Sequence, residues 1–163
     1  IIEELNIYLT NEEFDKAKEN LALAAEQDPT NEILWFSLGS VLDNLGNAEE
    51  AIKAYKKALE IKADYFDANY NLGALYFNQA VQGINAANDM WKPRMTKAES
   101  DAQKQMENDA KSLFETAKPF LEAAHATDAN DLETMRSLRD IYTRTGDDDK
   151  MLELTAKIKA ASN

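Results

Sequence analysis

The sequence predicts an all-α protein in which antiparallel pairs of helices follow one another along the chain. Only 5 of the 163 residues are glycine and 3 are proline, and apolar residues recur at intervals of three and four, which is the helical period. The loops between the expected helices are only a few residues long, so neighbouring helices must run antiparallel. Stacked helical hairpins form a solenoid, and a single compact bundle is the alternative arrangement.

Start and stop signals divide the chain into the expected helices. Several pairs fit the capping box, in which a polar side chain at the helix start and a Glu three residues later satisfy free N–H groups. These pairs are Thr10 with Glu13, Asn47 with Glu50, Thr96 with Glu99, and Asn130 with Glu133. The helices expected from these signals cover residues 2–10, 12–27, 31–44, 48–61, 67–88, 96–127, 131–145 and 148–161.

A period of 34 residues relates successive helical pairs. The series Ala17, Leu21, Ala24, Pro29 returns 34 residues later as Ala51, Tyr55, Ala58, Ala63. Between the two series the chain carries Trp35, Leu38, Gly39, Leu42 and Gly46, and Leu72, Gly73 and Tyr76 follow one period later. This spacing resembles the tetratricopeptide (TPR) motif. The resemblance implies an α-solenoid of about four repeats in one domain, 1–163: a truncated repeat at 1–30, then 31–64, 65–130, and a degenerate capping repeat at 131–163.

The third repeat is far longer than the second. Leu42 and Ala51 are 9 residues apart, whereas the matching Tyr76 and Ala117 are 41 apart. The excess predicts a helical hairpin, inserted at 78–116, that projects roughly 24 Å from the repeat body, as in bacterial TPR proteins with an extended third hairpin. Pro119 is expected to bend the returning arm. The expected coiled-coil seam consists of Phe77, Val81, Ile84, Asn88 and Trp91 against Met106, Ala110, Leu113, Ala117, Phe120 and Ala124.

The resemblance implies a non-catalytic protein-interaction module that binds a peptide or partner on its concave face. Asparagine and aromatic side chains on that face suit peptide capture, although ordinary solvated polar positions are an equal reading. The cationic clamp of chaperone-binding TPR proteins is absent, since Ile2, Asn6, Tyr70 and Ala74 stand in its places. The candidate peptide-binding residues are Asn6, Phe36, Ser40, Asn44, Tyr70, Asn71, Asn78, Arg136 and Asp140.

Met90 and Trp91 lie where the tip of the long hairpin is expected. In one interpretation Trp91 folds back on Met95 and seals the end of the hairpin. In the other it contacts a partner or a second copy of the chain, because tryptophan is enriched at interface hot spots. The alternative function is therefore a structural or oligomerising module that acts through this hairpin and the N-terminal end. Ile1 and Ile2 are expected to be covered by an upstream repeat or another chain, as in a piece of a longer protein.

The composition excludes several other classes of function. A net charge of −12 disfavours nucleic acid and anionic membranes and favours basic or neutral partners. No cysteine is present, and no apolar run is long enough to span a membrane. His125 is the only histidine, and Asp147–Asp149 lack the alternating pattern of a calcium loop. We therefore expect neither an enzyme nor a metal or cofactor site; the compartment stays open, and a cell-envelope or secreted parent is compatible with the resemblance.

Overall fold

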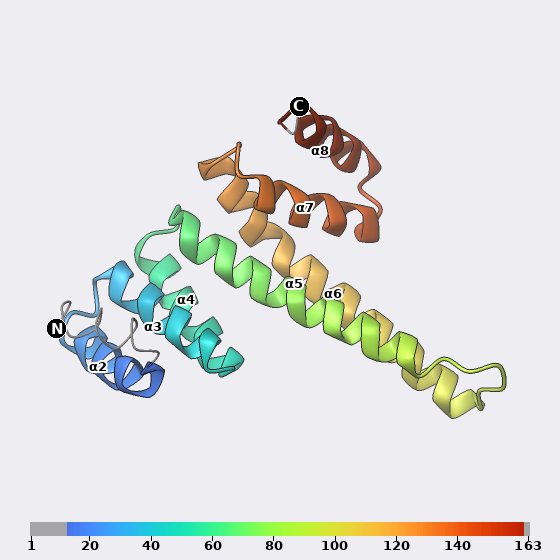
Figure 1. Cartoon of the computed structure of the whole chain (residues 1–163), viewed down its shortest axis with the longest axis horizontal. Helices are drawn as coiled ribbons and strands as arrows, with labels where there is room; N and C mark the ends of the chain where they lie inside the picture. Colours follow the sequence, from blue (N-terminus) through green and yellow to red (C-terminus); the bar gives the residue numbers. More distant parts are fainter. Residues whose placement is uncertain (1–12, 162–163) are drawn as a thin grey trace. The chain divides into compact units, whose positions relative to one another are not determined.

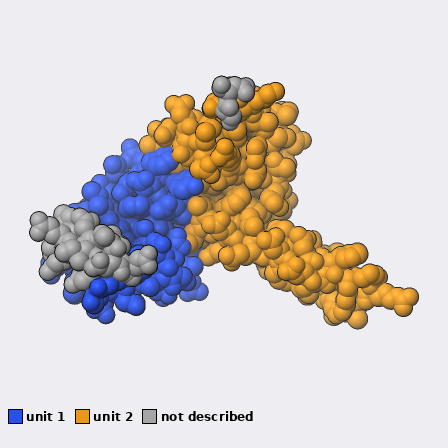
Figure 2. Space-filling model, viewed as in Figure 1, with its two compact units in different colours: residues 1–72 blue, residues 73–163 orange. Residues whose placement is uncertain are grey.

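The computed structural model of the chain describes residues 13–161. Every regular element in that part of the chain is an α-helix (Figure 1). The residues form two compact units, residues 1–72 and 73–163, which Figure 2 shows in different colours. The boundary between the units falls inside helix α5, Phe66–Asp89. The expected helix at 2–10, together with Thr10, Ile1 and Ile2, lies outside the described residues.

Unit 1 contains α2 (Phe14–Gln27), α3 (Glu32–Asn44), α4 (Ala48–Ile61) and the first turns of α5. Large side chains meet small ones in its core, as the repeat motif predicts. Gly39 of α3 lies against the Tyr55 ring of α4 so closely that an added Cβ would come within 2.6 Å of Cδ1. Four alanines at the repeated positions are buried inside helices, Ala17, Ala24, Ala51 and Ala58, while Ala63 lies in the loop after α4 and is exposed.

Asn69 takes the position that Trp35 occupies one repeat earlier, but it makes hydrogen bonds to the preceding loop through its side chain. Its side chain is 3% exposed. The Nδ2 group donates to the carbonyl oxygens of Ala63 at 2.8 Å and Tyr65 at 3.2 Å. These bonds satisfy two loop carbonyls before α5, so a polar side chain fixes the loop where the motif would place an aromatic ring.

Helix caps agree with the sequence prediction at one of the described positions and differ at two. Thr96 and Glu99 form a complete capping box at the start of α6. Asn47 is the N-cap of α4, but its side chain makes no capping hydrogen bond. At α7 the predicted cap Asn130 is wrong by one residue, because the Asp131 carboxylate accepts from Thr134 N at 2.7 Å. The charged acceptor of Asp131 makes the stronger capping bond.

Unit 2 contains the rest of α5, α6 (Lys97–Thr127), α7 (Leu132–Thr145) and α8 (Asp148–Ala161). Its two longest helices form the predicted hairpin: α5 has 24 residues and α6 has 31, against 13 and 14 in the pair α3 and α4. In Figure 2 the far end of this hairpin extends beyond the other helices of unit 2. Helix α6 is continuous through Pro119, whose side chain is exposed.

The seam of the hairpin agrees with the predicted one at Ala110, Ala117 and Ala124, which are buried, and differs from it at the larger side chains. Asn88 and Trp91 are exposed, and Phe77, Val81, Ile84, Met106, Leu113 and Phe120 are only half-buried. Small residues at three- and four-residue intervals form the contact together with the buried Phe114 and Leu121. A Cβ added at Gly73 would lie 2.6 Å from Leu121 Cγ, and one added at Gly83 would lie 3.2 Å from the Ala110 Cβ. Two helices joined through glycine and alanine approach closely, so their larger apolar neighbours flank the seam.

Candidate functional site

The first part of the candidate site is a stripe of side chains along α3. Phe36, Ser40 and Asn44 are spaced by four residues, so they share one helix face. The Phe36 ring centre lies 5.9 Å from that of Tyr55 and 5.1 Å from that of Tyr65. Asn44 Nδ2 donates to the Ser40 carbonyl oxygen at 2.8 Å, which leaves its amide oxygen available as an acceptor.

Tyr55 of α4 forms the floor beneath this stripe, and it was not among the predicted site residues. The side chain is 1% exposed. Asn71 Nδ2 donates to the Tyr55 hydroxyl at 3.4 Å, and the Ser40 side chain also hydrogen-bonds it. Burial, together with the charge of Asp43, raises the pKa of Tyr55 to about 12. The hydroxyl therefore stays protonated and holds α3 and α5 on either side of it through Ser40 and Asn71.

Asp43 brings a negative charge to the same place. It stands seven residues after Phe36, so it projects from the same face of α3. Partial burial raises the pKa of its carboxyl group, and no ion pair to that carboxylate exists among residues 13–161. Sequence reasoning missed Asp43, although its i+7 spacing from Phe36 was a usable signal. Phe36, Ser40, Asp43, Tyr55 and Asn71 are called the α3–α5 face below.

The other described candidates have neighbours of their own within each unit. Tyr70 stacks on Phe66 with ring centres 6.1 Å apart. Asn78, Arg136 and Asp140 lie in unit 2, where Arg136 pairs with Glu133 and Asp140 accepts from Arg139 at 2.8 Å. Asn6 lies outside the described residues. The α3–α5 face is therefore built from unit 1 alone.

The hairpin tip holds Trp91 in the open. The Trp91 side chain is 66% exposed, so it does not seal the end of the hairpin. The residues around it are ordered by hydrogen bonds: Trp91 N donates to Asn88 O at 3.0 Å, and Lys92 Nζ lies 2.7 Å from Glu99 Oε1. The bond from Lys92 and those from Thr96 lower the pKa of Glu99 to about 2, so the capping box stays charged in mild acid.

A hydrogen-bonded cluster joins three helices of unit 2. Glu122 Oε1 of α6 accepts from the Tyr142 hydroxyl of α7 at 2.7 Å and from Lys150 Nζ of α8 at 2.8 Å. Burial and the neighbouring Glu122 raise the pKa of Tyr142. His125 lines a cavity of about 130 Å³ beside this cluster with Tyr142 and Lys150. Glu122 and Lys150 form an ion pair between α6 and α8, and Tyr142 donates to the same carboxylate. This arrangement stabilises the packing of three helices and does not pair a nucleophile with a base.

Acid is expected to weaken unit 2 through Glu122. Burial alone would raise the pKa of this carboxyl group, but hydrogen bonds from Lys150 and Tyr142 outweigh it and hold the pKa below its ordinary 4.5. The stabilisation is therefore complete above pH 4.5 and is lost as the pH falls through the lower folded-state pKa. Glu122→Gln should cost about 1 kcal/mol at neutral pH and much less at roughly pH 3.

Urea unfolding monitored at both pH values measures this effect, and Glu107→Gln is the matched control on an exposed position of the same helix. An equal loss for Glu122→Gln at both pH values would contradict the assignment, because it would show that the charge of Glu122 contributes nothing.

Residues 13–161 contain neither a cluster of metal-ligating side chains nor a membrane-spanning helix. No group of three or more histidine or acidic side chains in that range is arranged to hold a metal ion. No helix there has both the length and the apolar content needed to cross a bilayer.

Known proteins resemble parts of this chain in sequence. A family model described as a TPR repeat matches residues 44–79. The peroxisomal targeting signal receptors of Kluyveromyces lactis and Candida albicans are 40% and 42% identical to this chain over a stretch of 72 residues. That stretch is 44% of this chain but only 13% and 12% of those receptors.

Solved structures share the fold over more of the chain. A crystal structure of a Bacteroides ovatus protein has a TM-score of 0.70 at 20% identity and covers 94% of this chain and 71% of its own. An IFIT1 monomeric mutant with Gppp-AAAA has a TM-score of 0.63 at 16% identity, over 88% of this chain and 29% of its own. Identities this low establish the fold alone. The fold is TPR-like.

A hollow on unit 1 lies beside a position where the second repeat departs from the TPR motif. In the motif, the position three residues after Leu-Gly is a tyrosine, which the third repeat keeps as Tyr76, but the second repeat has Leu42 there. An open pocket of about 500 Å³ lies beside this residue. Its walls come from α2, α3 and α4: Lys18, Glu19, Ala22, Trp35, Leu38, Leu42, Glu50, Lys53, Ala54 and Lys57. This pocket is called the Leu42 hollow.

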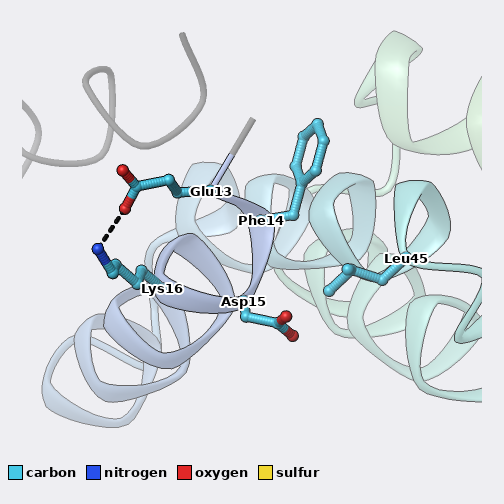
Figure 3. Close-up of a pocket in the computed structure, with 5 residues that line it drawn as sticks. All are labelled: Glu13, Phe14, Asp15, Lys16 and Leu45. Atoms are coloured by element: carbon cyan, nitrogen blue, oxygen red, sulfur yellow. Dashed lines mark ion pairs between the residues drawn. The ribbon is translucent and has the colours of Figure 1, made fainter. Parts of the chain in front are cut away.

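A second TPR pocket, of about 320 Å³, lies at the start of the described chain. Figure 3 shows Phe14 of α2 and Leu45 after α3 lining it, with the ion pair between Glu13 and Lys16 at its edge. The two charges pair with each other across one helical turn. The pocket therefore brings together no pair of groups suited to acid–base chemistry.

Proposed function

We propose that unit 1 is a non-catalytic protein-interaction module that captures an extended segment of a partner on the α3–α5 face. The observation that carries this proposal is the cluster around Tyr55, where an aromatic ring and hydrogen-bonding side chains from two helices converge. The Tyr55 bonds fix Ser40 and Asn71 in place before a partner arrives, which reduces the entropy lost on binding. The remaining donors and acceptors of Asn71 can pair with a peptide backbone.

The partner segment that fits this face is basic. Asp43 supplies a carboxylate without an internal ion pair, and its charge acts on the Tyr55 hydroxyl of the same face. A lysine or arginine of the partner would gain both this carboxylate and an adjacent aromatic surface. The net charge of −12 attracts such a segment from a distance.

The relatives agree with this mode of action. The aligned relatives are, by name, receptors for a peroxisomal targeting signal. The aligned stretch covers too little of those receptors to assign their ligand to this chain, so the ligand class rests on the α3–α5 face. We propose that this chain belongs to a bacterial TPR protein.

Two labelled probe peptides test the proposal, one carrying alternating lysine and aromatic residues and one with glutamate in place of lysine. We expect binding of the lysine peptide, measured by fluorescence anisotropy, to weaken roughly tenfold in Asn71→Ala. Asp43→Asn should reduce the preference for the lysine peptide over the glutamate peptide. Asn71→Ala removes a half-buried amide and its bond to the Tyr55 hydroxyl, and circular dichroism checks that the variant stays folded.

Asn88→Ala and Asp101→Asn are the matched controls, because they remove the same groups from exposed positions on the hairpin. Equal binding of both peptides by the unaltered protein would refute the basic preference. An equal effect of Asn71→Ala and Asn88→Ala would refute the α3–α5 face as the binding surface.

A second candidate function is a structural one in which the hairpin joins the chain to another copy. The observation that favours it is Trp91, a large apolar side chain that is 66% exposed at an ordered tip. An isolated exposed tryptophan gains free energy when a partner covers it. Concentration-dependent mass in solution distinguishes this function from peptide capture by a monomer.

A further inference from the structure

The hairpin tip carries a knob, which is the Trp91 side chain together with the cations around it. Arg94 and Lys97 are exposed and have no ion-pair partner within residues 13–161. No acidic residue lies between Asp89 and Glu99. In a chain with a net charge of −12, this short segment is therefore a local basic patch centred on an exposed aromatic ring.

The Leu42 hollow is a socket of matching chemistry. Its floor is formed by Trp35, Leu38 and Leu42, and its volume of about 500 Å³ falls within the range of pockets that enclose large organic groups. It lies where the TPR motif places a tyrosine ring and this repeat has the smaller leucine. An incoming aromatic side chain would replace the ring that the repeat lacks.

The charges at the rim complement those at the tip. Glu19 on α2 and Glu50 on α4 lie on opposite walls of the hollow, and neither has an ion-pair partner among the described residues. Of the three rim lysines, Lys18 pairs with Asp15 and Lys57 with Glu60, each within its own helix. Lys53 has no ion-pair partner among the described residues, so the unpaired rim charges are two carboxylates and one ammonium group. Arg94 and Lys97 beside an inserted Trp91 would meet the two unpaired carboxylates.

We propose that Trp91 of one copy inserts into the Leu42 hollow of a second copy, so that the chain associates head to tail. This inference rests on the second candidate function and adds the surface that the tip contacts. The two patches differ, so the contact is heterologous and leaves one knob and one socket free in every dimer. Mass in solution should then rise steadily with concentration rather than stop at a dimer.

Two variants block the two halves of this contact. Trp91→Ala removes the knob, and Leu42→Tyr fills the socket with the residue that Tyr76 provides one repeat later. Sedimentation velocity over a concentration series should show association weakened roughly 30-fold in each variant. Leu152→Ala is the matched control, because it removes a side chain that is 61% exposed elsewhere in unit 2, and it should associate like the unaltered chain.

A mixture of the two variants gives the decisive result. Trp91→Ala keeps its socket and Leu42→Tyr keeps its knob, so together they can make a single junction. We expect the mixture to form a one-to-one dimer and nothing larger, while each variant alone stays monomeric. A mixture that remains monomeric would overturn the proposed contact.

Other outcomes separate the two parts of the inference. If Trp91→Ala abolishes association and a folded Leu42→Tyr does not, the tip self-associates through another surface and the hollow is refuted as its socket. If the unaltered chain stays monomeric at all concentrations, both the second candidate function and this inference fail. Should Leu42→Tyr lose its helical circular dichroism, Ala22→Phe fills the same hollow from α2 and replaces it in each comparison.

Discussion

Phe114→Ala is expected to destabilise unit 2 by about 3–5 kcal/mol, the usual cost of removing a fully buried phenylalanine. Phe114 is 1% exposed. Its ring meets the edge of Phe77 at 5.4 Å, and the Arg144 guanidinium lies 5.1 Å from its centre. One side chain thus joins both arms of the hairpin to α7. Its loss would also enlarge a pocket of about 260 Å³ that Ile84 and Arg144 already line.

Chemical denaturation measures the loss of unit 2 stability, and hydrogen exchange locates it. Amides of α6 and α7 should lose protection, whereas those of α2 and α3 should keep it. Trp91→Ala removes a larger side chain from the same hairpin, but 66% of it is exposed, so its effect should stay within about 0.5 kcal/mol. Equal destabilisation by the two variants would show that burial does not govern the stability of the hairpin.

Gly39→Val should destabilise unit 1 by roughly 3 kcal/mol, at the upper end of the range for overpacking. A Cβ at this position would lie 2.6 Å from Tyr55 Cδ1 and 2.7 Å from Cε1. The Tyr55 ring is almost fully buried and hydrogen-bonded through its hydroxyl to Asn71, so it cannot turn aside. The displaced ring would also disturb the α3–α5 face, and binding of the lysine peptide should weaken in parallel.

Alanine at two glycines provides the matched comparison. At Gly83 an added Cβ would meet the Ala110 Cβ at 3.2 Å, a contact that a small shift relieves. The higher helix propensity of alanine, worth about 1 kcal/mol, should offset that strain. Gly83→Ala is therefore expected to be nearly neutral, whereas Gly39→Ala should destabilise. Urea midpoints compare the two, and a Gly39→Ala variant as stable as Gly83→Ala would contradict the close contact with Tyr55.

Features that depend on neighbouring residues could be predicted from the sequence. The described helix ends agree with the predictions to within two residues, because short loops and capping residues act locally. Thr96 and Glu99 cap α6 as predicted, since both halves of the box lie within one turn. The TPR period also predicted that Gly39 and Gly73 lie where two helices approach closely. A glycine that returns at a fixed spacing indicates a position with no room for a side chain.

The candidate site was predicted only in part. Phe36, Ser40 and Asn71 were expected on one face, and they converge in the structure. Tyr55 was missed because its position in the repeat marks it as a buried residue of α4. Asp43 was missed because an acidic residue on a helix is usually an ordinary surface residue. The spacing of Asp43 from Phe36 indicates a shared helix face, but the contacts of both residues with Tyr55 and of Tyr55 with Asn71 arise only when the helices pack.

The sequence by itself determined the helices, the 34-residue repeat and the existence of the long hairpin. Tertiary structure decided which faces of those helices meet. In the hairpin the sequence predicted Ala110 in the seam correctly, but on α5 it favoured larger residues, whereas Gly73 and Gly83 make the close contacts and Trp91 is exposed. The reason is physical: helix formation is driven by interactions within a few residues, whereas the choice of seam depends on how closely two backbones can approach.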